Sequence, residues 1–130
     1  MKRLAYFSPL NPMRTGISDY SEALLPYLAA GGRAEIDLFV DGYIPANEAI
    51  LSQFAVFDYR EYEPLRRSRG YAATIYQMGN SPFHGYIYET LLRHAGVTVL
   101  HDLVLHHFYM ERTLEYGDTA GYVREMAYTG

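Results

Sequence analysis

The chain has 130 residues, of which 49% are hydrophobic and 20% charged, and its formal net charge is −4. This composition is typical of one soluble globular domain, and the acidic balance argues against nucleic acid as a partner. The sequence contains no cysteine, which excludes disulfides and thiolate metal sites and suits a reducing compartment. We therefore expect a cytoplasmic protein.

Strand-like and helix-like segments alternate from the start of the chain. A short apolar run at residues 4–7 precedes a loop rich in proline, and residues 17–28 then place apolar side chains at helical spacing. Pro26 removes one helical hydrogen bond, so a kink or an early end of this helix is expected there. The candidate N-caps are Thr15, Ser18 and Asp19.

The middle of the chain continues the alternation. The segment at residues 43–53 is ambiguous, and residues 61–70 predict a polar turn or a short helix ending at Gly70, with an exposed arginine cluster. The polar segment EYEPLRRSRG spans residues 61–70, and further strands are predicted at residues 35–40, 54–59, 72–78 and 97–100.

The clearest helix lies in the segment SPFHGYIYETLLRHAG. Ser81 can cap it, and Pro82 occupies the first helical position, where proline is favoured. We expect His84 and His94 on the surface, with Gly96 ending the helix. The predicted apolar face consists of Phe83, Ile87, Leu91 and Ala95.

This alternation predicts an α/β fold, a Rossmann-like α/β/α arrangement of three layers with a mostly parallel sheet. In such sheets, ligands bind outside the carboxyl ends of the strands. The loops that leave carboxyl ends span residues 8–16, residues 79–82 and the segment from His101 onward. In a parallel sheet all three lie at one edge, which makes them one candidate site.

Gly16 opens the first predicted helix in that site. The N-terminus of a helix attracts phosphate or carboxylate, and a glycine lets such a ligand approach the backbone. The alternative is that Gly16 only makes a tight turn. Arg14, in the same loop, is a candidate for contacting an anion. Neither a dinucleotide fingerprint nor a P-loop motif occurs in the sequence.

His101 stands at a predicted strand end, where a histidine can bind a substrate hydroxyl or phosphate or act as acid or base. Asp102 either orients His101 or caps the following helix. Asn80 and Ser81 can hydrogen-bond a polyol, or serve only as turn and cap. His106 and His107 point to different sides of a helix, so we expect no metal site.

Two segments, FSPLNPMRTGISDYSEALLPYLA and YQMGNSPFHGYIYETLLRHAGVTVLHDLVLHH, resemble the N-terminal domain of family-4 glycosyltransferases. These are retaining enzymes of GT-B architecture, and the resemblance covers nearly the whole chain. It implies transfer of a sugar from a nucleotide-diphosphate sugar to an acceptor hydroxyl of a glycan, lipid or small molecule. It implies no metal or other cofactor, and it leaves peripheral membrane association of the full-length enzyme open.

The same resemblance implies that residues 1–130 are the acceptor-side half of a GT-B architecture and a shortened one. The C-terminal donor-binding domain, with its E-x7-E motif, is absent, so we expect the isolated chain to be inactive. Gly16 matches the glycine that presents its N–H to the donor phosphate, and His101, the expected catalytic residue, matches a histidine beside the transferred sugar. The expected residues for binding substrate or donor phosphate are Arg14, Thr15, Gly16, Asn80 and Asp102.

Other functions fit the same residues. One is a stand-alone flavodoxin-like module that binds a nucleotide or an anion without catalysis. Others are half of a sugar-nucleotide epimerase, or an interaction domain that docks a partner through the helix predicted after Leu105.

Overall fold

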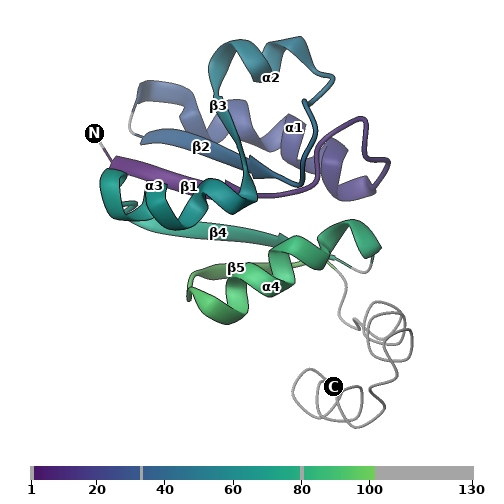
Figure 1. The fold of residues 1–130 in the computed structure, drawn as a ribbon. Helices are drawn as coiled ribbons and strands as arrows, with labels where there is room; N and C mark the ends of the chain where they lie inside the picture. Colours follow the sequence, from purple (N-terminus) through teal and green to yellow (C-terminus); the bar gives the residue numbers. More distant parts are fainter. Residues whose placement is uncertain (1, 33, 80, 102–130) are drawn as a thin grey trace, which may run out of the picture.

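The computed structural model describes residues 2–32, 34–79 and 81–101, which form a five-stranded parallel sheet in the order β3-β2-β1-β4-β5 (Figure 1). The strands are Lys2–Phe7 (β1), Ala34–Val40 (β2), Ala55–Asp58 (β3), Ala73–Met78 (β4) and Val97–Leu100 (β5). The helices are Gly16–Ala29 (α1), Glu48–Gln53 (α2), Tyr62–Arg69 (α3) and Gly85–Arg93 (α4). Short 3₁₀ turns at Ala30–Gly32, Tyr59–Glu61 and Pro82–His84 complete the order.

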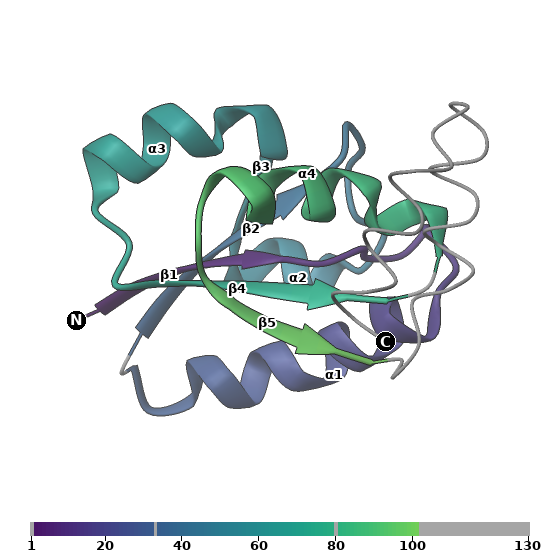
Figure 2. The ribbon, with the colours of Figure 1, turned by 90° about the horizontal axis from the view of Figure 1, so that it is seen from below.

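Helices cover both faces of this sheet, as Figures 1 and 2 show. Because successive strand residues point to opposite faces, Tyr6 packs with Leu25 of α1 and Ile50 of α2. Its neighbour Phe7 packs instead with Tyr62 of α3 and residues of α4. The predicted three-layer α/β/α fold is confirmed, and its strand order is the Rossmann one rather than the flavodoxin-like order 2-1-3-4-5.

Aromatic side chains fill the layer under α3 and α4. The ring of Phe7 stacks on Phe39 with 4.9 Å between centroids, and Tyr62 meets Phe7 edge-on at the same distance. Tyr86 of α4 donates its hydroxyl hydrogen bond to the carbonyl of Phe39 at 2.9 Å. Burial raises the pKa of Tyr86 well above its ordinary value, so this hydroxyl stays a donor.

One buried carboxylate lies on that same face, in β2. Asp37 is 2% exposed and accepts hydrogen bonds from Arg69 Nη1 at 2.8 Å and from Tyr71 Oη at 2.7 Å. Arg3 Nη1 lies 3.8 Å from the same oxygen. Arg69 is exposed, as predicted for the arginine cluster, but its guanidinium also pairs with Asp37, because the last turn of α3 brings it to the strand that carries this carboxylate.

The structure corrects the expected end of one helix and shows what the ambiguous segment forms. Helix α1 continues through Pro26 to Ala29, so the early end predicted at the proline is wrong. The ambiguous segment contains α2, capped by the side chain of Asn47. Within residues 2–32, 34–79 and 81–101, no helix has the length and apolar character needed to cross a membrane.

We expect Gly96→Ala to destabilise the fold, because Gly96 packs directly against β4. A Cβ at this position would lie 2.5 Å from the carbonyl oxygen of Thr74 and 2.7 Å from Cε2 of Tyr76. The expected loss is about 1–3 kcal/mol in the free energy of unfolding, the usual scale of overpacking. Urea denaturation measures it, with Gly16→Ala as the matched control in open space. An equal loss in both variants would contradict the packing argument.

Candidate functional site

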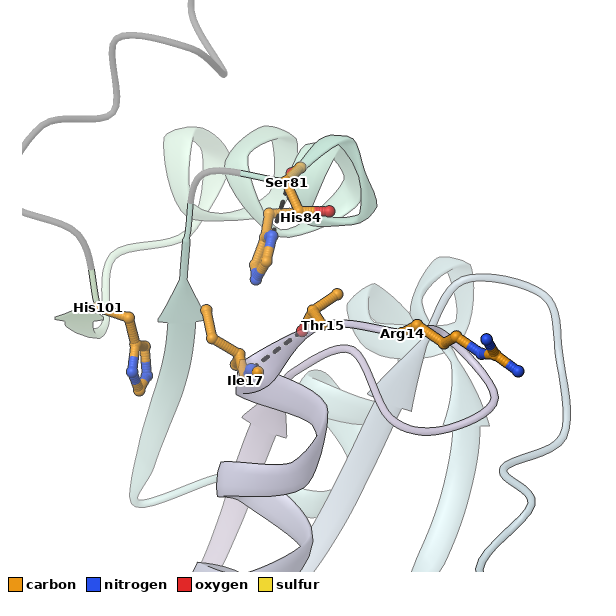
Figure 3. Close-up of a pocket in the computed structure, with 7 residues that line it drawn as sticks. Arg14, Thr15, Ile17, Ser81, His84 and His101 are labelled. Carbon is orange, nitrogen blue, oxygen red and sulfur yellow. Dashed lines mark hydrogen bonds between the residues drawn. The ribbon is translucent and has the colours of Figure 1, made fainter.

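A cleft of about 480 Å³ opens at the carboxyl ends of β1, β4 and β5 (Figure 3). Consecutive strands run outward from β1 to β2 and β3 on one side, and β4 and β5 lie on the other. A parallel sheet binds its ligands at such a reversal of strand order. The cleft is lined by Arg14, Thr15, Gly16, Ile17, Ser81, His84 and His101. The predicted convergence of the three loops at one edge of the sheet is thus confirmed.

The loop between β1 and α1 is held in place by hydrogen bonds from other elements. The carboxylate of Glu22 accepts hydrogen bonds from the backbone N–H of Asn11 at 2.7 Å and from Asn47 Nδ2 at 2.9 Å. The hydroxyl of Ser18 donates to the carbonyl of Met13 at 2.6 Å. These bonds join the loop to α1 and to the start of α2, so they fix the position of this wall of the cleft.

Thr15 and Gly16 form the start of α1. The hydroxyl oxygen of Thr15 accepts hydrogen bonds from the N–H groups of Ile17 and Ser18, both at 3.0 Å, which confirms Thr15 as the N-cap. Gly16 is the first residue of α1. The N–H of a first helical residue has no carbonyl partner inside its own helix. The N–H of Gly16 therefore remains the backbone donor of this turn that the cap does not use.

Neither a tight turn nor close packing explains why residue 16 is glycine. The backbone of Gly16 is outside the left-handed region, unlike that of Gly31 or Gly42. A Cβ at Gly16 would meet no atom of the described residues within 4 Å. The residue is exposed and lines the cleft. An open approach to the backbone is what the glycine provides.

Arg14 lies at the outer edge of the cleft. Its side chain is exposed, and Figure 3 shows it directed away from His84 and His101. Arg14 lies two residues before Gly16, in the loop after β1, and its guanidinium is turned outward. Its contact with an anion stays a prediction.

His101 follows β5 and forms the opposite wall. Its backbone N–H donates to the carbonyl of Met78 at 3.0 Å, which extends the sheet pairing by one residue. Its ring nitrogen Nε2 lies 2.6 Å from Oε1 of Gln77, and Tyr20 packs edge-on against the ring with centroids 4.6 Å apart. Two further predicted site residues, Asn80 and Asp102, lie outside the described residues.

His84 was expected on the surface of a helix, and this prediction is wrong. Its side chain is fully buried in the cleft, with Nδ1 3.1 Å from the carbonyl oxygen of Ser81. The segment starts as a 3₁₀ turn, which has fewer residues per turn than an α-helix. This shifts the buried face, so Phe83 is 44% exposed. The spacing from His84 to Ile87 and on to Leu91 is the pattern that could have revealed it.

Gly79, which the sequence analysis did not single out, explains how His84 fits. A Cβ at Gly79 would collide with Cδ1 of Ile17 and lie 3.0 Å from Cε1 of His84. The end of β4, the start of α1 and His84 therefore approach one another around a residue without a side chain. Gly79 is a packing residue of the cleft floor.

The chemistry of the lining favours an anion or a polyol. Hydroxyl, imidazole and backbone N–H groups can hydrogen-bond phosphate oxygens and sugar hydroxyls. Among the residues that the structure describes, no cluster of three His, Asp or Glu side chains could hold a metal ion. His94 lies outside the cleft, between α3 and α4, where its Nε2 is 2.6 Å from Glu63 Oε2.

Comparison of the chain with protein-family models, with curated proteins and with solved structures finds no match. The resemblance to family-4 glycosyltransferases therefore stays a prediction from the sequence.

We expect Thr15→Ala to lower the free energy of unfolding by about 1 kcal/mol, because α1 loses its N-cap. Thr15→Ser keeps a hydroxyl oxygen in reach of both N–H groups and should restore most of the stability. Thermal or urea denaturation of the two variants measures the difference. Equal stability of the alanine and serine variants would contradict the role of the hydroxyl as a cap.

Proposed function

We propose that this chain is the acceptor-side half of a retaining glycosyltransferase that uses a nucleotide-diphosphate sugar and has GT-B architecture. The observation that carries this proposal is Gly16, a glycine at the mouth of α1 that neither backbone conformation nor packing requires. A phosphate approaching the N–H of residue 16 explains it. The sequence resemblance supports the proposal as well, since Thr15, Gly16 and Ile17 of its T-G-I-S-D-Y part and His101 of its V-L-H-D part line this one cleft.

In this proposal the donor diphosphate lies against the start of α1. The bond between the sugar carbon and the diphosphate breaks, the acceptor hydroxyl oxygen forms the new bond to that carbon, and the proton of this hydroxyl passes to an oxygen of the departing diphosphate. Negative charge grows on the departing diphosphate, and the N–H of Gly16 together with the positive end of the 14-residue helix stabilises it. His101, on the opposite wall, positions the sugar. We retain Arg14, Thr15, Asn80 and Asp102 as candidate contacts to the substrates.

A second domain is part of the proposal. It supplies the remaining cations around the diphosphate, and its closure over the cleft excludes water, which limits hydrolysis of the donor. The acceptor is a glycan, a lipid or a small molecule, and no metal or other cofactor takes part. We include a cytoplasmic location, in agreement with the cysteine-free sequence.

A non-catalytic module that binds a nucleotide or an anion is the second candidate. The observation that favours it is that hydrogen bonds of Glu22 and Ser18 to neighbouring parts of the chain hold the loop that forms this wall of the cleft. The strand order excludes the flavodoxin-like form of this module.

We expect Gly16→Ala, and more strongly Gly16→Val, to weaken diphosphate binding. The measurement is calorimetric titration of the chain with inorganic pyrophosphate and with a panel of nucleoside diphosphates. The expected loss is about tenfold or more, the scale of a hydrogen bond to a charged group. Stability should stay within about 0.5 kcal/mol, as for other exposed substitutions. Ser52→Ala in α2, outside the cleft, is the control. Unchanged affinity in the valine variant would remove Gly16 from the site.

We expect His101→Ala to lower the release of nucleoside diphosphate from a nucleotide sugar by about tenfold or more in the two-domain enzyme. The residue-1–130 chain alone should give no turnover, because half of the active site is contributed by the second domain. An unchanged rate would exclude His101 from the site, and turnover by the chain alone would overturn the proposal of a half-site. Diphosphate binding with no turnover in the longer protein would favour the binding module.

A further inference from the structure

A continuous line of hydrogen bonds runs from His101 into the interior of the protein. It begins at the end of β5, crosses β4 and β1, reaches α1 and ends in the loop after β1. We call its four inner side chains, Gln77, Tyr6, Ser21 and Ser8, the hydrogen-bond chain. His101 Nε2 lies 2.6 Å from Gln77 Oε1, and Gln77 Nε2 lies 3.1 Å from Tyr6 Oη. Tyr6 Oη lies 2.9 Å from Ser21 Oγ, which lies 2.7 Å from Ser8 Oγ. Ser8 Oγ lies 2.8 Å from the carbonyl oxygen of Pro9.

These four side chains are buried in an otherwise apolar layer. Each is at most 2% exposed, and Tyr6 packs in the same cluster as Leu25 and Ile36. Apolar groups of the same shape can replace a buried hydrogen-bonded pair at little cost in stability. Stability of the fold therefore does not explain a polar line at this depth, and its end at His101 points to the cleft.

The carbonyl of Pro9 fixes the direction of every bond in the line. A carbonyl only accepts, so the single proton of Ser8 is donated to it, and Ser8 must accept from Ser21. Ser21 in turn accepts from Tyr6. Burial raises the pKa of Tyr6, which keeps that hydroxyl protonated as the donor.

The same argument continues to the histidine. Since the proton of Tyr6 goes to Ser21, the phenol oxygen accepts from Nε2 of Gln77. The amide of Gln77 then turns its oxygen toward His101, and an oxygen can only accept. Nε2 of His101 is therefore the nitrogen that carries a proton, in the neutral ring as well as in the imidazolium.

We infer that the hydrogen-bond chain holds the neutral ring of His101 as the Nε2–H tautomer, and that Gln77 and Tyr6 are positioning residues for it. Nδ1 then carries the lone pair of the neutral ring. A ring in this tautomer has Nε2 as a donor and Nδ1 as an acceptor, which decides how His101 can bind a sugar hydroxyl or a phosphate oxygen. This last step rests on the proposed function, whereas the tautomer does not.

The test is nitrogen-15 NMR of the imidazole of His101 in the chain labelled at histidine, above the pH at which the ring loses its second proton. In the wild type we expect Nε2 protonated and Nδ1 unprotonated. Tyr6→Phe removes the acceptor of the Gln77 amide, which can then turn and donate to Nε2. The Nδ1–H population should rise by about fivefold or more, the scale of one neutral hydrogen bond.

Tyr62→Phe is the matched control. Tyr62 is buried too, at 4% exposed against 1% for Tyr6, and its hydroxyl lies 2.6 Å from Thr74 Oγ1 on the other face of the sheet. It should leave the tautomer of His101 unchanged. Ser21→Ala, a smaller change to the line, should shift the tautomer in the same direction as Tyr6→Phe, which keeps the test available if the phenylalanine variant does not fold.

Two results would overturn the inference: a wild-type ring that is mainly Nδ1–H, or equal effects of Tyr6→Phe and Tyr62→Phe on His101. In the two-domain enzyme, Tyr6→Phe should lower kcat more than Tyr62→Phe does, with the same direction of change for Ser21→Ala. The expected NMR result without any turnover of nucleotide sugars supports the inference and overturns the proposed function. Turnover of nucleotide sugars by an enzyme in which His101 is mainly the Nδ1–H tautomer supports the proposed function and overturns the inference.

Discussion

Parallel pairing of β1 with both β2 and β4 determines where the other elements lie. Its register sets Phe7 beside Phe39 on one side and beside Tyr76 on the other. The three strands therefore reach their carboxyl ends together, and the chain leaves β1 at the point where strand order reverses. Because α1 starts there and β5 ends beside β4, the mouth of a helix and a histidine face one cleft. The position of the site is determined by this strand pairing rather than by the loops at the ends of the strands.

Hydrogen bonds and close packing hold the walls of the cleft in place. Glu22 ties two loops together, Thr15 closes the first turn of α1, and Gly79 lets three elements approach closely. A ligand that enters does not have to order these groups, so more of its interaction energy appears as affinity. Fixed dipoles are also what stabilises charge in a reaction, since they need no rearrangement as the charge grows.

The sequence predicts the fold well because its signals are local. Strand and helix periods alternate, glycine and proline mark the ends, and the parallel rule then brings Gly16 and His101 to one edge. The sequence pattern did not reveal that His84 is buried, because the helix starts with a 3₁₀ turn, which changes the side chains that face inward. The direction of Arg14 depends on the path of a loop. Gln77 and Tyr6 are 71 positions apart in the sequence, and neither residue type indicates a hydrogen-bond partner so far along the chain.

Asp37 has a consequence for how β2 finds its place. Its carboxylate is matched by Arg69, Tyr71 and Arg3 only when β2 pairs with β1 in the observed register. A slip of one residue would turn every side chain of β2 to the opposite face. Asp37 would then lie among the aliphatic side chains under α1, and the two arginines would lose their counter-charge. With Ile36, Leu38, Phe39 and Val40 alone on its buried faces, β2 would tolerate several alignments; the buried acid Asp37 makes the misaligned ones unstable.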